Sequence, residues 1–314
     1  MQPLHFLTGA ELSVAQLDAL LDRAAALKRE PLASRALAGR CVGLVFQKPS
    51  TRTRVSFEVG IHELGGHALI LRSDEMQLSR GEGVRDTALV LARHLAAVGV
   101  RTGPDAMLEE LAAHSQIPVI NMLSARHHPC QALADLLTLR EACGSLAGLR
   151  VAYVGDGNNV ARSLAVLGTL AGLHLAIASP EGYSLEDDLS LPDAATGVVT
   201  RHRDPREAVS GAVAVYTDVW VSMGDEGDAD ARRSALSDYR VDDALLDCAA
   251  PGAFAMHDLP AHPGEEISAE VLYGSRQRIW DQAENRRHAQ KALLELLLPA
   301  GAGTGAGAGA GEGA

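Results

Sequence analysis

The sequence lacks three features that would define its cellular setting. Its four cysteines form no CxxC pair, and the opening MQPLHFLTGAEL lacks the basic and then apolar pattern of a secretory signal. No apolar run approaches the ~20 residues of a membrane-spanning helix. We therefore expect a cytoplasmic protein with free thiols that makes no contact with a membrane.

Positive charge is also scarce, with 28 Lys and Arg against 40 Asp and Glu and a formal net charge of -12. Nucleic acid and anionic membranes need a broad basic face, so neither is expected as a partner, and a small anion is the better candidate. Residues Cys248, His257, His262 and Glu265 match no zinc spacing. We expect no metal and no cofactor.

What the chain does contain is short apolar runs that alternate with longer periodic segments. Its 314 residues, 47% of them hydrophobic, suffice for two globular domains. The alternation is typical of βα units, so we predict an α/β fold with two doubly wound parallel sheets. The predicted strands are residues 41–46, 68–71, 95–100, 117–122, 149–155, 173–179, 212–219 and 254–257.

The pattern of strands restarts after a polar helix around residues 131–142 and the break GSLAG. We take this as the domain boundary and expect a ligand between the two domains, at the carboxyl ends of the strands. The predicted units are a first domain at 1–143, a second at 144–281, an amphipathic helix at 282–298 and a disordered Gly/Ala tail at 299–314.

A basic cluster, STRTR, follows the first predicted strand. If Ser50 or Thr51 caps a helix that begins near Thr53, free backbone N–H groups and the positive end of the helix dipole face the ligand beside Arg52 and Arg54. This arrangement would hold a phosphate without a metal.

The same stretch also permits a different interpretation. Residues 55–61 alternate between apolar and polar in the manner of a strand, although Phe57, Ile61 and Leu64 fit helical spacing and two glycines then stop the helix. From pattern alone, a solvated charge cluster is as good a reading as an anion site.

Five further motifs occur in order after STRTR. They are HHPCQALADLL from His127, GDGNNVARS from Gly155, DVWVSMGDE from Asp218, MHDLPAHPGEE from Met256 and QAENR from Gln282. Together with STRTR they resemble the transcarbamoylase family, and the DxxxSMG form is that of its ornithine branch. The resemblance extends from about His5 to Leu298.

The resemblance implies an enzyme that moves the carbamoyl group of carbamoyl phosphate to the side-chain amine of L-ornithine. The products are L-citrulline and phosphate, in arginine biosynthesis. It implies that the first domain binds carbamoyl phosphate, that the second binds the amino acid, and that the C-terminal helix packs back on the first. It also implies a homotrimer whose shared sites are completed by the loop MQLSRGEG, residues 76–83, of a neighbouring subunit.

The residues that the resemblance assigns fall into two groups. Those for carbamoyl phosphate are Ser50, Thr51, Arg52, Thr53, Arg101, His128, Gln131 and Arg286. Those for ornithine are Asn159, Asp218, Ser222, Met223, Asp258 and Leu259. The expected catalytic residues are Arg101, His128, Gln131, Asp258 and Arg286, because cations and N–H donors stabilise the negative charge that a carbonyl oxygen gains under attack.

Three departures from the family pattern keep alternatives open. HPTQ is HPCQ here, which places Cys130 beside the expected carbamoyl site, and Arg162 follows NNVA where the family has Asn or His. HCLP is HDLP, so Asp258 opens the alternative of a different diamino acid as acceptor. More distant alternatives are a nucleotide-binding oxidoreductase, suggested by GDG at 155–157 without a third glycine, and a catalytically inactive family member.

Overall fold

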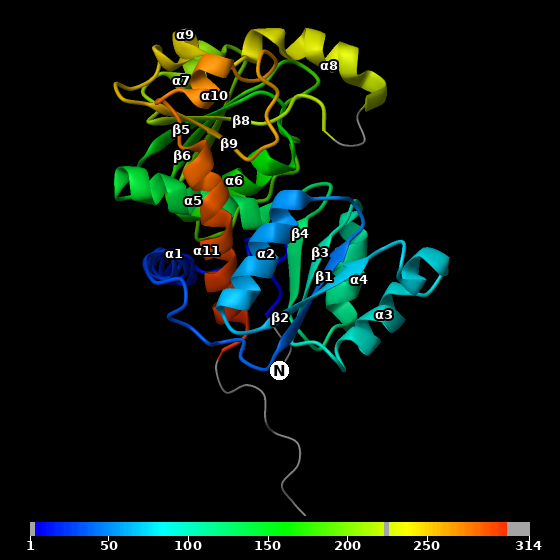
Figure 1. The fold of residues 1–314 in the computed structure, drawn as a ribbon. Helices are drawn as coiled ribbons and strands as arrows, with labels where there is room; N and C mark the ends of the chain where they lie inside the picture. The colour runs from blue at the N-terminus through cyan, green and yellow to red at the C-terminus, as the bar shows by residue number, and fades with distance from the viewer. Residues whose placement is uncertain (1–3, 223–225, 300–314) are drawn as a thin grey trace, which may run out of the picture.

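The computed structural model describes residues 4–222 and 226–299, and these form two separate parallel β-sheets covered by helices (Figure 1). The first sheet has the order β2-β1-β3-β4 and the second the order β7-β6-β5-β8-β9. All neighbouring strands within each sheet pair in parallel. The predicted α/β fold with two parallel sheets is confirmed.

The strands coincide with the apolar runs of the sequence because parallel strands are buried on both faces. The first sheet consists of β1 Cys41–Phe46, β2 His67–Arg72, β3 Ala97–Arg101 and β4 Val119–Leu123. The second consists of β5 Arg150–Val154, β6 His174–Ala178, β7 Val198–His202, β8 Ala214–Thr217 and β9 Phe254–His257. The sequence did not predict β7, which lies at a sheet edge and carries a polar half without an apolar run.

Helices connect the strands in the order expected of βα units. The α-helices are α1 Val14–Arg29, α2 Thr51–Glu63, α3 Val84–Leu91, α4 Asp105–His114, α5 Pro129–Cys143, α6 Asn159–Leu170, α7 Pro205–Val209, α8 Ala229–Leu236, α9 Asp243–Leu246, α10 Ala269–Tyr273 and α11 Ile279–Leu297. Short 3₁₀ turns occupy Gln77–Arg80, Glu226–Asp228 and Ser237–Tyr239. Within the described ranges, none of these helices combines the length and apolar character needed to cross a bilayer.

Strand order reverses direction once in each sheet, between β1 and β3 and between β5 and β8. Ligands of open α/β sheets bind outside the carboxyl ends of the strands at such points. The residues that follow β1, β3, β5 and β8 are therefore the ones that the topology favours as a site.

Two helices join the sheets. Helix α5 is buried along Pro129–Leu139 and leads from the first sheet into the second. Helix α11 packs against α1, α2 and α5 and also contacts β9, and Figure 1 shows it running from the second sheet to the side of α1 and α2. The ammonium of Lys291, fully buried, contacts Glu63 of α2 and the carbonyl oxygen of Pro31. The C-terminal helix thus packs back on the first half of the chain, as predicted.

The ends of this helix differ slightly from expectation. Helix α11 begins at Ile279 and ends at Leu297, where residues 282–298 were predicted. Of the predicted Gly/Ala tail, residues 300–314 lie outside the described part of the structure.

Candidate active site

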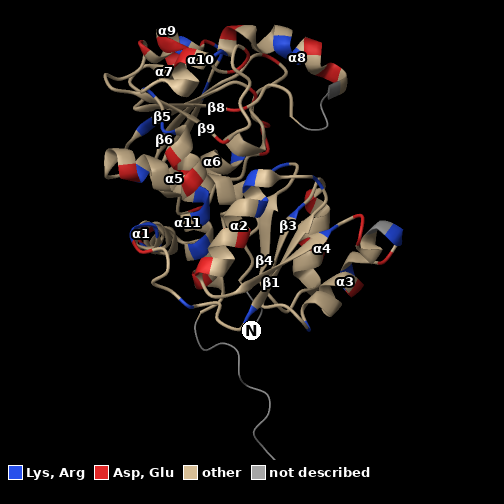
Figure 2. Ribbon diagram, viewed as in Figure 1, with Lys and Arg blue, Asp and Glu red and all other residues tan. Residues whose placement is uncertain are grey.

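The basic cluster STRTR forms the start of a helix. Helix α2 begins at Thr51, and the side chain of Ser50 caps it by accepting a hydrogen bond from the backbone N–H of Thr53 at 3.4 Å. No acidic residue occupies the first turn, so its N–H groups and dipole present a positive end. Figure 2 shows the basic residues at this end of α2. The helical interpretation of the stretch is confirmed.

The two arginines of this turn have different surroundings. Arg52 is half-buried and acts electrostatically on Arg101 and Arg286. Arg54 is exposed, and its guanidinium pairs with Glu58 at 3.1 Å along the outer side of α2. Arg54 thus points away from Arg52, because positions two apart lie on different faces of a helix, and its expected part in holding an anion stays a prediction.

Arg286 joins three helices at the centre of the cluster. Its guanidinium, on α11, donates to the hydroxyl of Thr53 on α2 at 2.8 Å and to the amide oxygen of Gln131 on α5. The side chain is 3% exposed, and its Nε has no hydrogen-bond partner among the described residues. Residues more than 200 positions apart in the sequence thus meet at one guanidinium.

Three arginines, Arg52, Arg101 and Arg286, lie close enough together to repel one another. Arg101, at the end of β3, is buried, and burial together with the charges of Arg286 and Arg52 lowers its pKa to about 10. Burial also lowers the pKa of Arg286, and the charge of Asp258 opposes that effect. Both guanidiniums stay protonated at neutral pH, so an anion placed among them would relieve their repulsion.

His128 lies at the N-cap position of α5, next to these cations. Its backbone N–H donates to the hydroxyl of Ser163 on α6 at 2.6 Å, which ties the first sheet to the second. Burial, with the charges of Arg286 and Arg101, lowers the imidazole pKa well below its usual range, and Nδ1 has no partner in the described part of the chain. The ring is therefore neutral at physiological pH and offers one donor and one acceptor.

The second sheet contributes two carboxyl groups, each at the carboxyl end of a strand. Asp218 follows β8 and Asp258 follows β9, and carboxylate oxygens of the two lie within 4.8 Å of each other. Asp218 also accepts from the amide of Asn158 and from the backbone N–H of Val219, each at 2.7 Å. Burial raises the pKa of both carboxyls, and the charge of Asp258 raises that of Asp218 further. Such a pair titrates as one unit.

The remaining residues that are expected to bind ornithine have different surroundings. The amide of Asn159 donates to the carbonyl oxygen of Ser124 at 2.8 Å, across the two sheets. Leu259 has a left-handed backbone with φ 64°, and its N–H donates to Nδ1 of His257 at 2.9 Å. Ser222 is half-buried at the end of the described segment, and Met223 lies outside the described residues.

Asp218, His257 and Asp258 are close enough together to be considered as metal ligands. Both ring nitrogens of His257 are already engaged, however. Nδ1 accepts from the backbone of Leu259, and Nε2 lies 3.1 Å from a carboxylate oxygen of the buried Glu266. The arrangement of His257 is explained by these hydrogen bonds.

The GDG turn after β5 has a packing role. A Cβ atom at Gly157 would lie 2.3 Å from the backbone nitrogen of Leu185, and the N–H of Gly157 donates to the carbonyl oxygen of Tyr183 at 2.8 Å. Residues 183–185 thus pack directly against the turn, and the third glycine of a dinucleotide turn is absent. The oxidoreductase alternative therefore loses the motif on which it rested.

Two of the family departures have partners outside the set of expected site residues. The thiol of Cys130 donates to the backbone oxygen of Asn121, and burial raises its pKa to about 12. Arg162 does not reach the acceptor side, because its guanidinium pairs with Glu186 at 2.7 Å and with Asp188. Only Asp258 changes the charge among the site residues.

Sequence reasoning missed several residues that hold the site together. Asn158, Ser163, Asp135 and Gln282 support the assigned side chains through hydrogen bonds. All four lie inside the quoted motifs, which was the only available signal.

A surface hollow of about 440 Å³ lined by Glu186, Asp187 and Arg201 includes none of the site residues and lies elsewhere on the second sheet.

Comparison with known proteins agrees with this geometry. Residues 4–141 match the carbamoyl-P binding domain of aspartate/ornithine carbamoyltransferase, and residues 147–297 match its Asp/Orn binding domain. The chain is 52% identical over 302 residues to the ornithine carbamoyltransferase of Acidothermus cellulolyticus, covering 94% of this chain and 97% of that one. It is 50% identical over 300 residues to that of Methanoculleus marisnigri, with the same coverage.

Solved structures show the same fold. The ornithine carbamoyltransferase of Thermus thermophilus superposes with a TM-score of 0.87 at 43% identity, over 95% of this chain and 100% of that one. The ornithine carbamoyltransferase from Pyrococcus furiosus gives 0.90 at 42% identity, over 95% and 97%. The chain belongs to the aspartate/ornithine carbamoyltransferase family.

Proposed function

We propose that this protein transfers the carbamoyl group of carbamoyl phosphate to the side-chain amine of L-ornithine, giving L-citrulline and phosphate for arginine biosynthesis. The names of relatives that are about half identical support ornithine as the acceptor. The observation that carries the proposal is electrostatic. Asp258, from the second sheet, acts on Arg101 and Arg286, so an anion site and a cation site adjoin.

On the donor side, the start of α2 holds the phosphate through Ser50, Thr51, Arg52 and Thr53. Backbone N–H groups at a helix start and a guanidinium together suit a dianion. The residues that address the carbamoyl group are Arg101, His128, Gln131 and Arg286. As the amine attacks, the carbonyl oxygen gains negative charge, and donors already held in place stabilise it without reorganisation.

On the acceptor side, Asp218 and Ser222 take the α-ammonium of ornithine. Asn159 and the backbone of Met223 hold the α-carboxylate, and Leu259 lines the pocket. The neutral side-chain amine attacks the carbonyl carbon, a C–N bond forms and the bond to the phosphate oxygen breaks. The phosphate leaves with the amine proton, so the protein supplies no nucleophile and acts by positioning.

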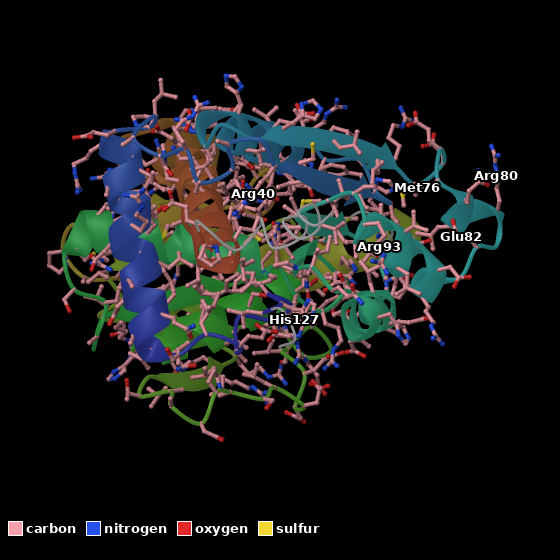
Figure 3. The ribbon with its side chains drawn as sticks, turned by 90° about the horizontal axis from the view of Figure 1, so that it is seen from below. Arg40, Met76, Arg80, Glu82, Arg93 and His127 are labelled. Atoms are coloured by element: carbon pink, nitrogen blue, oxygen red, sulfur yellow. The ribbon has the colours of Figure 1, made fainter. Side chains whose placement is uncertain are left out.

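We further propose a homotrimer whose sites are completed by residues 76–83 of a neighbouring subunit. Figure 3 shows this segment projecting from the body, with Arg80 and Glu82 at its outer edge. The proposal includes a carbamoyl phosphate-binding domain at 1–143, an ornithine-binding domain at 144–281 and a cytoplasmic location. Light scattering should give three times the mass of the chain, and a fully active monomer would contradict the assembly.

A panel of acceptors with saturating carbamoyl phosphate tests the function. Ornithine should be turned over much faster than its shorter and longer diamino homologues. Putrescine should be poor because it has no carboxylate, and aspartate because its second carboxylate would meet Asp258. Faster turnover of a homologue would refute ornithine as the acceptor. Titration with carbamoyl phosphate alone separates an active enzyme from a scaffold, which need not bind it.

A further inference from the structure

Asp135 is an acid in the HHPCQALADLL segment whose hydrogen bonds reach well beyond its own helix. It lies on α5, one turn after Gln131, and is fully buried. Its Oδ1 accepts hydrogen bonds from three elements: the amide of Gln131 at 2.8 Å, the amide of Gln282 on α11 at 2.7 Å, and the hydroxyl of Tyr216 on β8 at 3.4 Å. It therefore lies where both sheets and α11 meet.

Because Oδ1 of Asp135 is the acceptor in all three contacts, it determines which way the neighbouring amides face, whether or not Oδ2 carries a proton. Gln131 turns its NH₂ group toward Asp135, and its oxygen therefore faces the guanidinium of Arg286. Gln282 does the same, and its oxygen accepts from the backbone N–H of His257 at 2.9 Å. One carboxylate thus directs two amides toward opposite sides of the site.

Two hydrogen-bonded paths leave Asp135 as a result. The path through Gln131 ends at Arg286, which belongs to the proposed carbamoyl phosphate side. The path through Gln282 ends at His257, the neighbour of Asp258 on the ornithine side. Asp135 can therefore influence the residues on both the carbamoyl phosphate side and the ornithine side. Neither it nor Gln282 has to contact a substrate to do so.

This arrangement is unfavourable for folding. Burial raises the pKa of Asp135 to about 7, and its Oδ2 has no hydrogen-bond partner within residues 4–222 and 226–299. A buried, incompletely paired carboxylate is less stable than a well-packed neutral group. A buried carboxyl with a strongly raised pKa next to a proposed active site is a candidate for a functional role.

We propose that Asp135 is a positioning residue that sets the direction of both glutamine amides and so couples the carbamoyl phosphate residues to the loop that carries Asp258. The inference rests on the proposed carbamoyl transfer and adds to it a residue that links the two substrates. Other titratable groups face Asp135 from the surrounding elements, namely Tyr216 on β8, Tyr153 on β5, Asp258 after β9 and Arg286 on α11.

The first test is Asp135→Asn, which preserves shape and removes the charge. Because the folded carboxyl has a raised pKa, wild type loses stability as pH rises through about 7, and the amide variant does not. We expect the variant to unfold at the same or a higher temperature than wild type at about pH 8, while kcat/KM falls between about tenfold and a hundredfold. A lower unfolding temperature with unchanged kinetics would mean a structural role and overturn the proposal.

The second test is Gln282→Leu, which cuts only the path to His257. The KM for ornithine should rise, and the Kd for carbamoyl phosphate should stay within about twofold. Gln290→Leu is the matched control, because Gln290 is a buried glutamine on the same helix whose amide has no partner in the described chain. The control should leave both constants unchanged.

These variants keep the inference separable from the proposed function. If wild type fails to carbamoylate ornithine, the proposed function fails, whereas the stability comparison and the carbamoyl phosphate titration can still be made. If wild type is active and Asp135→Asn retains its kcat/KM, only the inference is overturned. Should Asp135→Asn not fold, Gln282→Leu decides alone, and a variant of Gln282 that behaves like Gln290→Leu refutes the coupling.

Discussion

The proposed donor and acceptor sides of the site contain opposite charges, and on each side buried like charges lie close together. On the donor side Arg52, Arg101 and Arg286 repel one another, and burial and this repulsion lower the pKa of Arg101. On the acceptor side the carboxyls of Asp218 and Asp258 lie close together, and burial raises the pKa of both. Each side therefore carries a charge opposite to that of the substrate group proposed to bind there. The uncompensated charges lower the stability of the folded protein and favour substrate binding.

The two sides differ in how the charges are held. Arg286 is held by neutral partners, the hydroxyl of Thr53 and the amide of Gln131, so its charge is fixed in place. The acidic pair can instead lower its own repulsion by retaining a proton. The donor side is thus a permanent cation site, whereas the charge of the acceptor side depends on pH and on the ammonium that enters.

The largest expected effect concerns the donor side alone. Arg52→Ala should weaken carbamoyl phosphate binding by about 1.5–3 kcal/mol, the worth of a hydrogen bond to a charged group. Arg54→Ala, two residues along the same helix, should change it by less than about 0.5 kcal/mol because Arg54 pairs with Glu58 on the exposed face. Titration calorimetry measures both, and equal losses would show that the two arginines share the phosphate.

The acceptor side is tested by Asp258→Cys. A nearby carboxylate stabilises the ammonium form of the attacking amine, whose pKa in water is about 10.4, and so opposes the proton loss that attack requires. The variant should have a higher maximal rate near neutral pH, by about tenfold, and an optimum displaced to lower pH. The two pH–rate profiles decide the matter. Superimposable profiles, or a faster wild type at neutral pH, would show that Asp258 is remote from the amine or acts as its base.

The raised pKa of Asp258 also predicts that the stability of the folded protein depends on pH. Because the folded pKa of Asp258 is raised, its contribution is fully present below the ordinary aspartate pKa and is lost as pH rises through the folded value. Asp258→Asn should therefore unfold at a higher temperature than wild type at about pH 8, with a gain of about 1.4 kcal/mol for each unit by which the pKa is raised. Thermal unfolding at about pH 4 and pH 8 measures it, and a gain that does not grow with pH would contradict the assignment.

The smallest effect is expected for Arg162→Asn. The partners of Arg162, Glu186 and Asp188, are largely exposed, so losing the pairs should cost at most about 1 kcal/mol. The KM for ornithine should be unchanged because the guanidinium points away from the acceptor side. A clear rise in that KM would show that Arg162 contributes to ornithine binding. The acceptor side would then contain a cation as well as the two carboxyls.

Much of the fold was predictable from local pattern. Strands buried on both faces appear as continuous apolar runs, and these predicted all of the described strands except β7. The edge strand β7, VVTRH, lacks the signal because polar residues make up its second half, whereas the edge strand β2, HALILR, keeps an apolar run although it is partly exposed. The resemblance likewise marked Arg101, Arg286, Asp218 and Asp258, whose charges act on one another in the folded chain although up to 185 positions separate them in the sequence.

The sequence by itself determined which residue types the site contains and which strands they follow, because both depend on short stretches of chain. Only the tertiary structure decided which of two neighbouring arginines is half-buried, where Arg162 points and what surrounds Asp135. These outcomes depend on elements far away in the sequence, such as α11 against α2 and α5. A side chain's direction and pKa are set by the groups that pack on it, and no local pattern carries that information.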